Sequence, residues 1–188
     1  MKHWRLILLW SGLLLALAVA NHGIVQRERI LSDGRVLLLE LAPIDPRSMM
    51  QGDYMALRFA AVDDIRNSFY PELRNGGNAK ALKQMSVWNN DSCRPEGCHD
   101  GYAVFAIDSE GVGRFIREQV AARPIAPGEM AVRYRERGWR EIRIASNAWF
   151  FPEGQAKRYA LAKYGELHIN DDGEALLTGL HDADRKRL

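Results

Sequence analysis

The sequence predicts a mainly β (α+β) domain preceded by an N-terminal transmembrane helix. Three observations support this fold class. An uncharged apolar run opens the chain, short stretches of alternating apolar and polar residues recur after it, and turn residues separate those stretches. The 188 residues suffice for one domain and a short extra segment. We therefore expect residues 1–26 to form the anchor. Residues 27–188 should form an antiparallel β-rich sandwich or partly open barrel with one or two helices.

The apolar run spans residues 6–20, and the stretch without a charged side chain continues to residue 26. At a rise of about 1.5 Å per residue it is long enough to cross a bilayer as a helix. Lys2 and Arg5 precede it, so the positive-inside rule keeps the N-terminus in the cytoplasm. We therefore expect a single-pass protein of the cytoplasmic (inner) membrane, with its C-terminal domain on the periplasmic, extracytoplasmic side. Two alternatives remain open: a secretory signal cleaved after Ala20, and a buried core helix.

The charge balance argues against one class of partner. The chain has 26 Lys and Arg against 24 Asp and Glu, and two of the cations are Lys2 and Arg5 in the anchor. The remainder of the chain is therefore neutral overall. Binding to a phosphate backbone requires a net basic face, so we expect no nucleic-acid partner.

The first half of the domain begins with a charged connector. We expect residues 21–34 to form this juxtamembrane connector, which ends at the turn signal Asp33-Gly34. An apolar strand is expected next over residues 35–41, followed by a proline-containing loop. Residues 54–60 alternate, with Met55, Leu57 and Phe59 on one side, which predicts a half-buried strand. The next stretch is ambiguous and suits a helix that ends before Pro71.

The sequence of the second half of the domain predicts hairpins and one helix. The apolar stretches and turn residues predict strands at 102–107, 113–122, 130–135 and 140–145, a helix at 155–163, and a final hairpin of residues 166–169 and 174–180. The charged tail from residue 182 to 188 is expected to fray.

Cys93 and Cys98 enclose a turn-forming Arg-Pro-Glu-Gly segment. In an oxidising compartment the pair is expected to form a small disulfide loop. His99 follows directly, and the Cys-x4-Cys-His spacing is a rare variant of a haem attachment sequence; with Asp100 it also gives a weak metal-site pattern. We favour the disulfide, and the sequence predicts neither a cofactor nor a metal site.

The most distinctive stretch lies between residues 43 and 59. It reads Pro-Ile-Asp-Pro-Arg-Ser-Met-Met-Gln-Gly-Asp-Tyr-Met-Ala-Leu-Arg-Phe. Here the chain resembles the bacterial family named after its GDYXXLXY motif, and an N-terminal membrane segment is common in that family. The match consists of Gly52, Asp53, Tyr54 and Leu57, with Phe59 where the family name has tyrosine. The resemblance implies a membrane-associated protein, since some members are found alongside multi-spanning membrane proteins, but it implies no particular chemistry.

Two readings of this motif follow from its residue types. Gly52 and Asp53 suit the turn into a strand, while Leu57 and Phe59 can fill the core, so the motif can be purely structural. Alternatively the polar side chains form a ligand or partner site. The residues in question are Asp45, Arg47, Gly52, Asp53, Tyr54, Leu57 and Phe59.

An enzymatic alternative uses Ser48 as the nucleophile of a membrane-anchored serine hydrolase. Ser48-Met49 followed by Gly52-Asp53 resembles a signal peptidase, an enzyme in which a neutral lysine acts as the base. However, the spacing between these pairs and the context of Lys80 and Lys83 do not match that family. We therefore expect a non-enzymatic binding or accessory partner of another envelope membrane protein.

Overall fold

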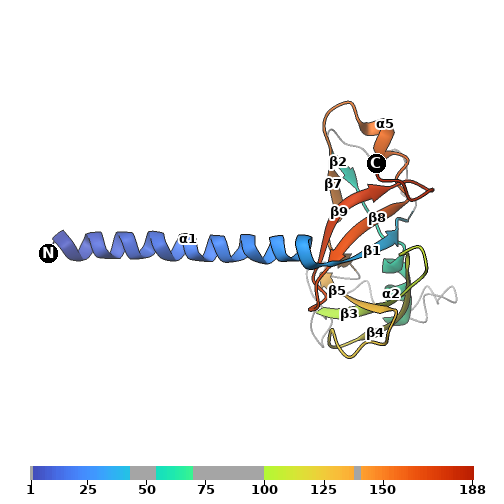
Figure 1. Ribbon diagram of the computed structural model, residues 1–188, viewed down its shortest axis with the longest axis horizontal. Helices are drawn as coiled ribbons and strands as arrows, with labels where there is room; N and C mark the ends of the chain where they lie inside the picture. The colour runs from blue at the N-terminus through green and yellow to red at the C-terminus, as the bar shows by residue number, and fades with distance from the viewer. Residues whose placement is uncertain (1, 43–53, 70–99, 138–140) are drawn as a thin grey trace, which may run out of the picture.

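The computed structural model describes residues 2–42, 54–69, 100–137 and 141–188. One long helix projects from a β-rich domain (Figure 1). The described elements, in chain order, are α1 (Lys2–Asp33), β1 (Arg35–Glu40), β2 (Tyr54–Ala56), α2 (Ala61–Phe69), β3 (Asp100–Ile107), β4 (Gly113–Gln119), β5 (Glu129–Arg137), β6 (Glu141–Ile144), β7 (Ala148–Phe150), α5 (Ala156–Tyr159), β8 (Tyr164–Ile169) and β9 (Ala175–His181).

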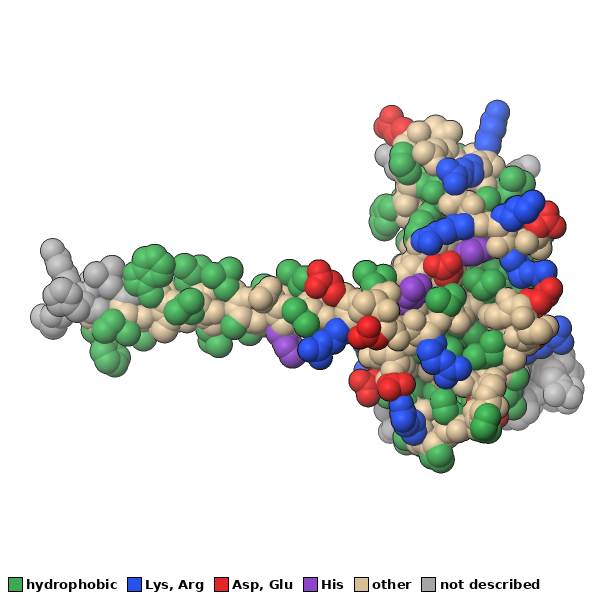
Figure 2. All heavy atoms as spheres, in the orientation of Figure 1, with side chains coloured by type: hydrophobic (Ala, Val, Ile, Leu, Met, Phe, Trp, Pro, Cys, Tyr) green, Lys and Arg blue, Asp and Glu red, His purple; other side chains and the backbone are tan. Residues whose placement is uncertain are grey.

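Helix α1 carries the apolar run. Among the described residues it is the one helix long and apolar enough to cross a membrane, and none of its apolar stretch is buried by the domain. Figure 2 shows apolar side chains around most of its length. The expected connector is helical as well, because Ile30 is only 4% exposed and its carbonyl accepts the Gly34 N–H at 3.1 Å. The expected boundary between residues 26 and 27 therefore falls inside a continuous helix.

The described strands form antiparallel sheets and do not close into a barrel, which confirms the mainly β fold class. Their orders are β1-β8-β9, β2-β7 and β4-β3-β5-β6. The expected hairpins are present as β3–β4, β5–β6 and β8–β9. Strand β1 pairs with β8 although most of the chain lies between them. This long-range pair brings the end of α1 next to the C-terminal hairpin.

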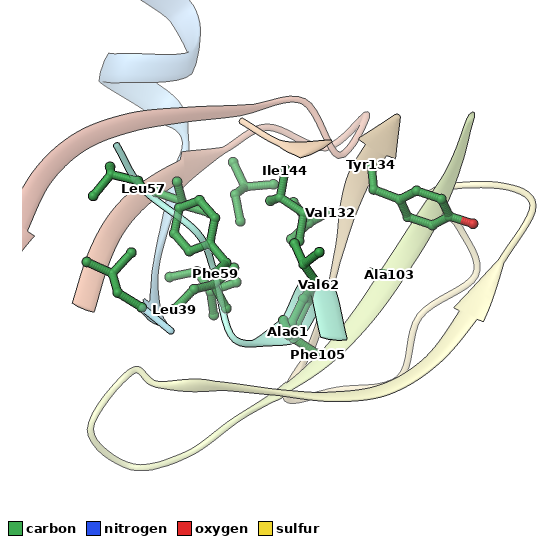
Figure 3. Close-up of a cluster of buried hydrophobic side chains, with 14 of the residues drawn as sticks. Leu39, Leu57, Phe59, Ala61, Val62, Ala103, Phe105, Val132, Tyr134 and Ile144 are labelled. Atoms are coloured by element: carbon green, nitrogen blue, oxygen red, sulfur yellow. The ribbon is translucent and has the colours of Figure 1, made fainter. Parts of the chain in front are cut away.

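The core lies between the three-stranded and four-stranded sheets. Leu37 of β1, Leu167 of β8, and Phe105 and Val132 of the larger sheet are completely buried. Helix α2 covers part of the larger sheet and adds Ile65, which is also fully buried. Figure 3 shows this cluster, with the side chains of Leu57 and Phe59 from the GDYXXLXY-like segment pointing into it. The alternation in the sequence thus marks the inward faces of the strands.

The helix expected over residues 155–163 is shorter, because α5 ends at Tyr159. Tyr159 is buried and stacks on Phe151 with ring centroids 5.0 Å apart. Lys163 has already left the helix, since its N–H donates to the His181 carbonyl at 2.7 Å. The start of the β8–β9 pairing therefore overrides the helical pattern.

The expectation of a frayed tail is wrong. The Leu188 N–H donates to the Leu180 carbonyl at 2.9 Å, and Leu188 packs against the core. Arg185 forms an ion pair with Glu110 at 2.5 Å. These contacts bind the charged tail back onto the domain.

Candidate functional site

The motif segment is described from Tyr54 onward. The structure therefore places Tyr54, Leu57 and Phe59. The other residues singled out in the sequence lie outside the described residues: Asp45, Arg47, Ser48, Gly52 and Asp53 around the motif, and Cys93 and Cys98.

We call the extended segment of residues 54–59, which begins with β2, the motif strand. It connects two sheets. Residues Tyr54–Ala56 pair with Ala148–Phe150, and the Leu57 N–H continues the ladder to the Asn147 carbonyl at 2.7 Å. The strand then crosses to the edge of β1, where the Arg58 carbonyl accepts the Ala42 N–H at 2.7 Å. The motif is thus a joint between the β2–β7 ribbon and the three-stranded sheet.

The inner face of this strand is part of the core. Met55, Leu57 and Phe59 are 2%, 7% and 3% exposed, as their alternation predicts. Phe59 packs on Gly165 of β8 so closely that a Cβ added at Gly165 would lie 2.8 Å from Phe59 Cε1. Figure 3 shows the Phe59 ring in the same cluster as Leu39 and Leu57. The inner face therefore has a packing role.

The outer face presents an aromatic pair. Tyr54 is 37% exposed and Phe150, its partner on β7, is 74% exposed. Their ring centroids are 5.7 Å apart. Large aromatic side chains left at the surface in one place are typical of protein interfaces.

A cavity of about 330 Å³ opens beside the motif strand, between α2, β6 and the turn that follows β6. We call it the motif groove. Its apolar floor consists of Leu57, Phe59, Val62, Ile142 and Ile144, all of them buried. Among the described residues that line it, the charged ones are arginines: Arg58, Arg66 and Arg143.

Asp63 holds two of these arginines in place. Its carboxylate accepts hydrogen bonds from Arg58 Nη1 at 3.1 Å and from Arg66 Nη1 at 2.8 Å. One acidic side chain is thus shared between two guanidinium groups.

Comparison with known proteins agrees with the motif. The model of the GDYXXLXY protein family matches residues 16–180. The chain belongs to the GDYXXLXY family. This match covers most of the chain, from within α1 to β9, and confirms the resemblance seen in the sequence. No curated protein and no solved structure matches the chain.

This GDYXXLXY protein also has a polar cluster next to the end of α1, which the sequence did not predict. The cluster consists of Glu166, His168, Thr178, His181 and Arg187. Glu166 is 8% exposed, and its carboxylate lies 2.7 Å from Thr178 Oγ1 and 2.7 Å from His181 Nε2. His168 Nε2 and Arg187 Nη1 each lie 3.7 Å from it. Figure 2 shows the two histidine side chains on this face with an acidic side chain between them.

The cluster links the domain to the anchor. His168 Nδ1 lies 3.1 Å from the Leu31 carbonyl in the last turn of α1. His181 Nδ1 lies 2.9 Å from the Arg185 carbonyl. A carbonyl oxygen can only accept, so each Nδ1 carries a proton and donates. Among the described residues no group of three His, Cys, Asp or Glu side chains is placed to hold a metal ion.

The environment of Glu166 favours its charged form. Burial by itself raises the pKa of Glu166, but the hydrogen bonds from Thr178 and His181 and the charge of Arg187 outweigh burial and lower the pKa. The carboxylate is therefore a fixed negative charge between basic partners. Sequence reasoning missed it because Glu166 and His181 meet only through the register of the β8–β9 hairpin, which a bulge shifts after Glu166.

Proposed function

We propose that this GDYXXLXY protein is a single-pass, membrane-anchored binding or accessory protein that docks onto another envelope membrane protein. The observation that carries the proposal is the unbroken passage of α1 into the domain. Ile30 is buried against the domain, and His168 donates to the Leu31 carbonyl. The helix end is thus bound to the domain rather than joined to it by a free linker.

This attachment sets the height of the domain above the bilayer. The uncharged stretch ends at Gln26 and α1 ends at Asp33. At about 1.5 Å per residue, the domain begins roughly 10 Å beyond the hydrocarbon boundary. At that height it meets headgroups and the extramembrane loops of neighbouring membrane proteins. Lys2 and Arg5 before the apolar run support the extracytoplasmic side of the inner membrane for this domain.

The docking surface in this proposal is the outer face of the β2–β7 ribbon. Tyr54 and Phe150 form its exposed aromatic pair. Tyrosine is enriched among the residues that carry most binding energy, and aromatic side chains are enriched in interface centres. Tyr54 belongs to the motif strand and Phe150 to β7, and neither contributes to the buried inner face of the motif strand. A binding role and a packing role therefore coexist in one segment.

The test is in-membrane cross-linking of the full chain, followed by purification and identification of the captured protein. We compare the wild type with Tyr54→Ala and Phe150→Ala, and use Ile116→Ala, another exposed apolar side chain, as the matched control. We expect one multi-spanning membrane protein to be captured by the wild type and the control, and lost in the two ribbon variants.

If the ribbon variants fold and capture the same protein undiminished, the ribbon is not the docking surface. Labelling of the chain by a fluorophosphonate at Ser48 would instead support the serine hydrolase and contradict the binding proposal. An activated serine reacts with this reagent, whereas an ordinary turn serine does not.

A further inference from the structure

The polar cluster around Glu166 also fixes the C-terminal tail, residues 182–188, to the domain. We propose that His181 is a pH-dependent latch. It holds the tail on β9 while its ring is a doubly protonated imidazolium, and it releases the tail when the ring loses a proton. This inference concerns the regulation of the domain and does not depend on the docking proposal. Two hydrogen bonds of one histidine ring carry it.

Both ring nitrogens of His181 lie against hydrogen-bond acceptors. Nδ1 is 2.9 Å from the Arg185 carbonyl, and Nε2 is 2.7 Å from the Glu166 carboxylate. Burial raises the pKa of Glu166, but its hydrogen-bond donors and the charge of Arg187 outweigh burial and lower it, so the carboxylate is ionised. Neither a carbonyl nor an ionised carboxylate can donate. Each ring nitrogen therefore donates, and a ring that donates from both nitrogens is an imidazolium.

The bond from His181 is one of several contacts that hold the tail against the edge of β9. The Leu188 N–H donates to the Leu180 carbonyl at 2.9 Å, and Arg187 Nη2 donates to the Thr178 carbonyl at 2.7 Å. Arg187 also forms an isolated antiparallel bridge with His181. The tail thus supplies hydrogen-bond donors to the edge of β9, as a neighbouring strand does. Opening the latch takes these donors away from that edge.

Loss of one proton breaks the bond to the tail and spares the bond to β8. A neutral imidazole has a single N–H, for which the Glu166 carboxylate and the Arg185 carbonyl compete. The charged carboxylate is the stronger acceptor, so the hydrogen stays on Nε2. Nδ1 then presents a lone pair to the Arg185 carbonyl oxygen, and the two acceptors repel each other. The latch is therefore closed where Glu166 is ionised and His181 is protonated, and it opens as pH rises through the titration of His181.

A second histidine meets the same carboxylate. His168 Nε2 of β8 lies 3.7 Å from Glu166, while His168 Nδ1 donates to the Leu31 carbonyl of α1. Arg187 of the tail also lies 3.7 Å from Glu166 and keeps its charge throughout. Other charged or titratable residues next to His181, along the chain, across the strand pairing or through Arg185, are Glu110, Lys163, Tyr164, Asp182, Arg185 and Lys186. Side chains of these types ordinarily titrate outside the neutral range, whereas histidine titrates within it. The experiment therefore has to separate His181 from His168.

The experiment is an NMR titration of the isotopically labelled full chain in detergent micelles, from about pH 5.5 to about pH 9.5, which brackets the ordinary titration of histidine. The nitrogen signals of the His181 ring report its protonation. Solvent exchange of the Leu188 amide hydrogen, corrected for the intrinsic rate at each pH, reports the attachment of the tail. We expect both ring nitrogens to be protonated at the lower pH. As the ring loses a proton, the protection of the Leu188 amide should fall at least about tenfold with the same midpoint, the size expected for one hydrogen bond from a charged donor.

Two glutamine variants identify the histidine responsible. His181→Gln should abolish the pH dependence of the Leu188 exchange, because glutamine has no proton to lose in this range. His168→Gln is the matched control, since it removes the other histidine at the same carboxylate, and it should keep the pH dependence. Near-UV circular dichroism checks the fold of each variant. The wild-type titration needs no variant, so it decides the result if His181→Gln does not fold.

A His181 ring that is neutral at about pH 5.5 while the Leu188 amide is protected overturns the inference. Protection of Leu188 that is unchanged after the ring has lost its proton overturns it as well. A pH dependence that disappears in His168→Gln and persists in His181→Gln belongs to the other histidine and refutes the latch. None of these outcomes bears on the β2–β7 ribbon, which cross-linking tests separately.

Discussion

The contact between Phe59 and Gly165 gives a quantitative test of how the motif strand packs against β8. In Gly165→Ala the new Cβ would lie 2.8 Å from Phe59 Cε1 and 3.2 Å from Leu177 Cδ1. Phe59 is 3% exposed, and apart from the motif groove that it helps to line, its ring is surrounded by packed side chains. Such overpacking costs about 1–3 kcal/mol. The reduced freedom of alanine in the unfolded chain returns about 0.4–1 kcal/mol of that cost.

The expected net loss is therefore about 1–2 kcal/mol, which lowers Tm by roughly 2–8 °C for a domain of this size. The assay is thermal unfolding of the full chain in detergent, followed by near-UV circular dichroism. Gly23→Ala is the matched control, because a Cβ at Gly23 meets nothing within 4 Å and should not lower Tm. Adding Phe59→Leu should reduce the loss caused by Gly165→Ala, since the two side chains are in direct contact. A Tm for Gly165→Ala equal to the wild-type value, or a loss unaffected by Phe59→Leu, would refute this packing.

Three further predictions concern the turn after β6, the polar cluster and the tail. Ala145→Gly should raise Tm, because relief of the left-handed conformation at φ +50° stabilises the fold by about 1 kcal/mol; a lower Tm in this variant would show that residue 145 is unstrained. Glu166 has a lowered pKa in the folded protein, so the stability it contributes is complete above the unfolded glutamate value of about 4.3 and is lost as pH falls through the lower folded value. The Tm advantage of the wild type over Glu166→Gln should thus be full at pH 6 and shrink toward pH 3, and an advantage independent of pH would contradict it. Deleting residues 186–188 should cost roughly 1–2 kcal/mol, because it removes the Leu188–Leu180 hydrogen bond and the packing of Leu188; an unchanged unfolding midpoint in urea would mean that the tail is frayed after all.

Much of the fold could be predicted because local patterns are sufficient for strands and hairpins. The stretch over residues 130–135 places Met130, Val132 and Tyr134 on one side, and all three are buried in β5. The turn Asn170-Asp171-Asp172-Gly173 joins β8 and β9 as its residue types indicate, with Gly173 at φ +78°. In both cases the local sequence pattern and the packing of the folded domain favour the same backbone conformation.

The remaining features depend on contacts between segments that are distant in the sequence. The connector is helical because Ile30 is buried against the domain and the Leu31 carbonyl accepts from His168. The tail is ordered because Arg185 meets Glu110, 75 residues earlier. The polar cluster around Glu166 needs the pairing of β1, β8 and β9, which no local pattern specifies. Propensity and periodicity contain no information on such pairs, so these parts could not be predicted.

The motif strand shows why a structural and a binding interpretation of one sequence motif need not compete. Successive side chains of an extended strand point to opposite faces. Met55, Leu57 and Phe59 fill the core, whereas Tyr54 and Arg58 stay at the surface. Tyr54 is 37% exposed as a whole residue, and the side chain of Arg58 is 44% exposed. Substitutions on the first face should therefore lower Tm, while Tyr54→Ala should lower partner capture at a nearly unchanged Tm. If Tyr54→Ala loses stability as much as the inner-face variants, the motif acts through the fold alone, and the ribbon loses its role in binding.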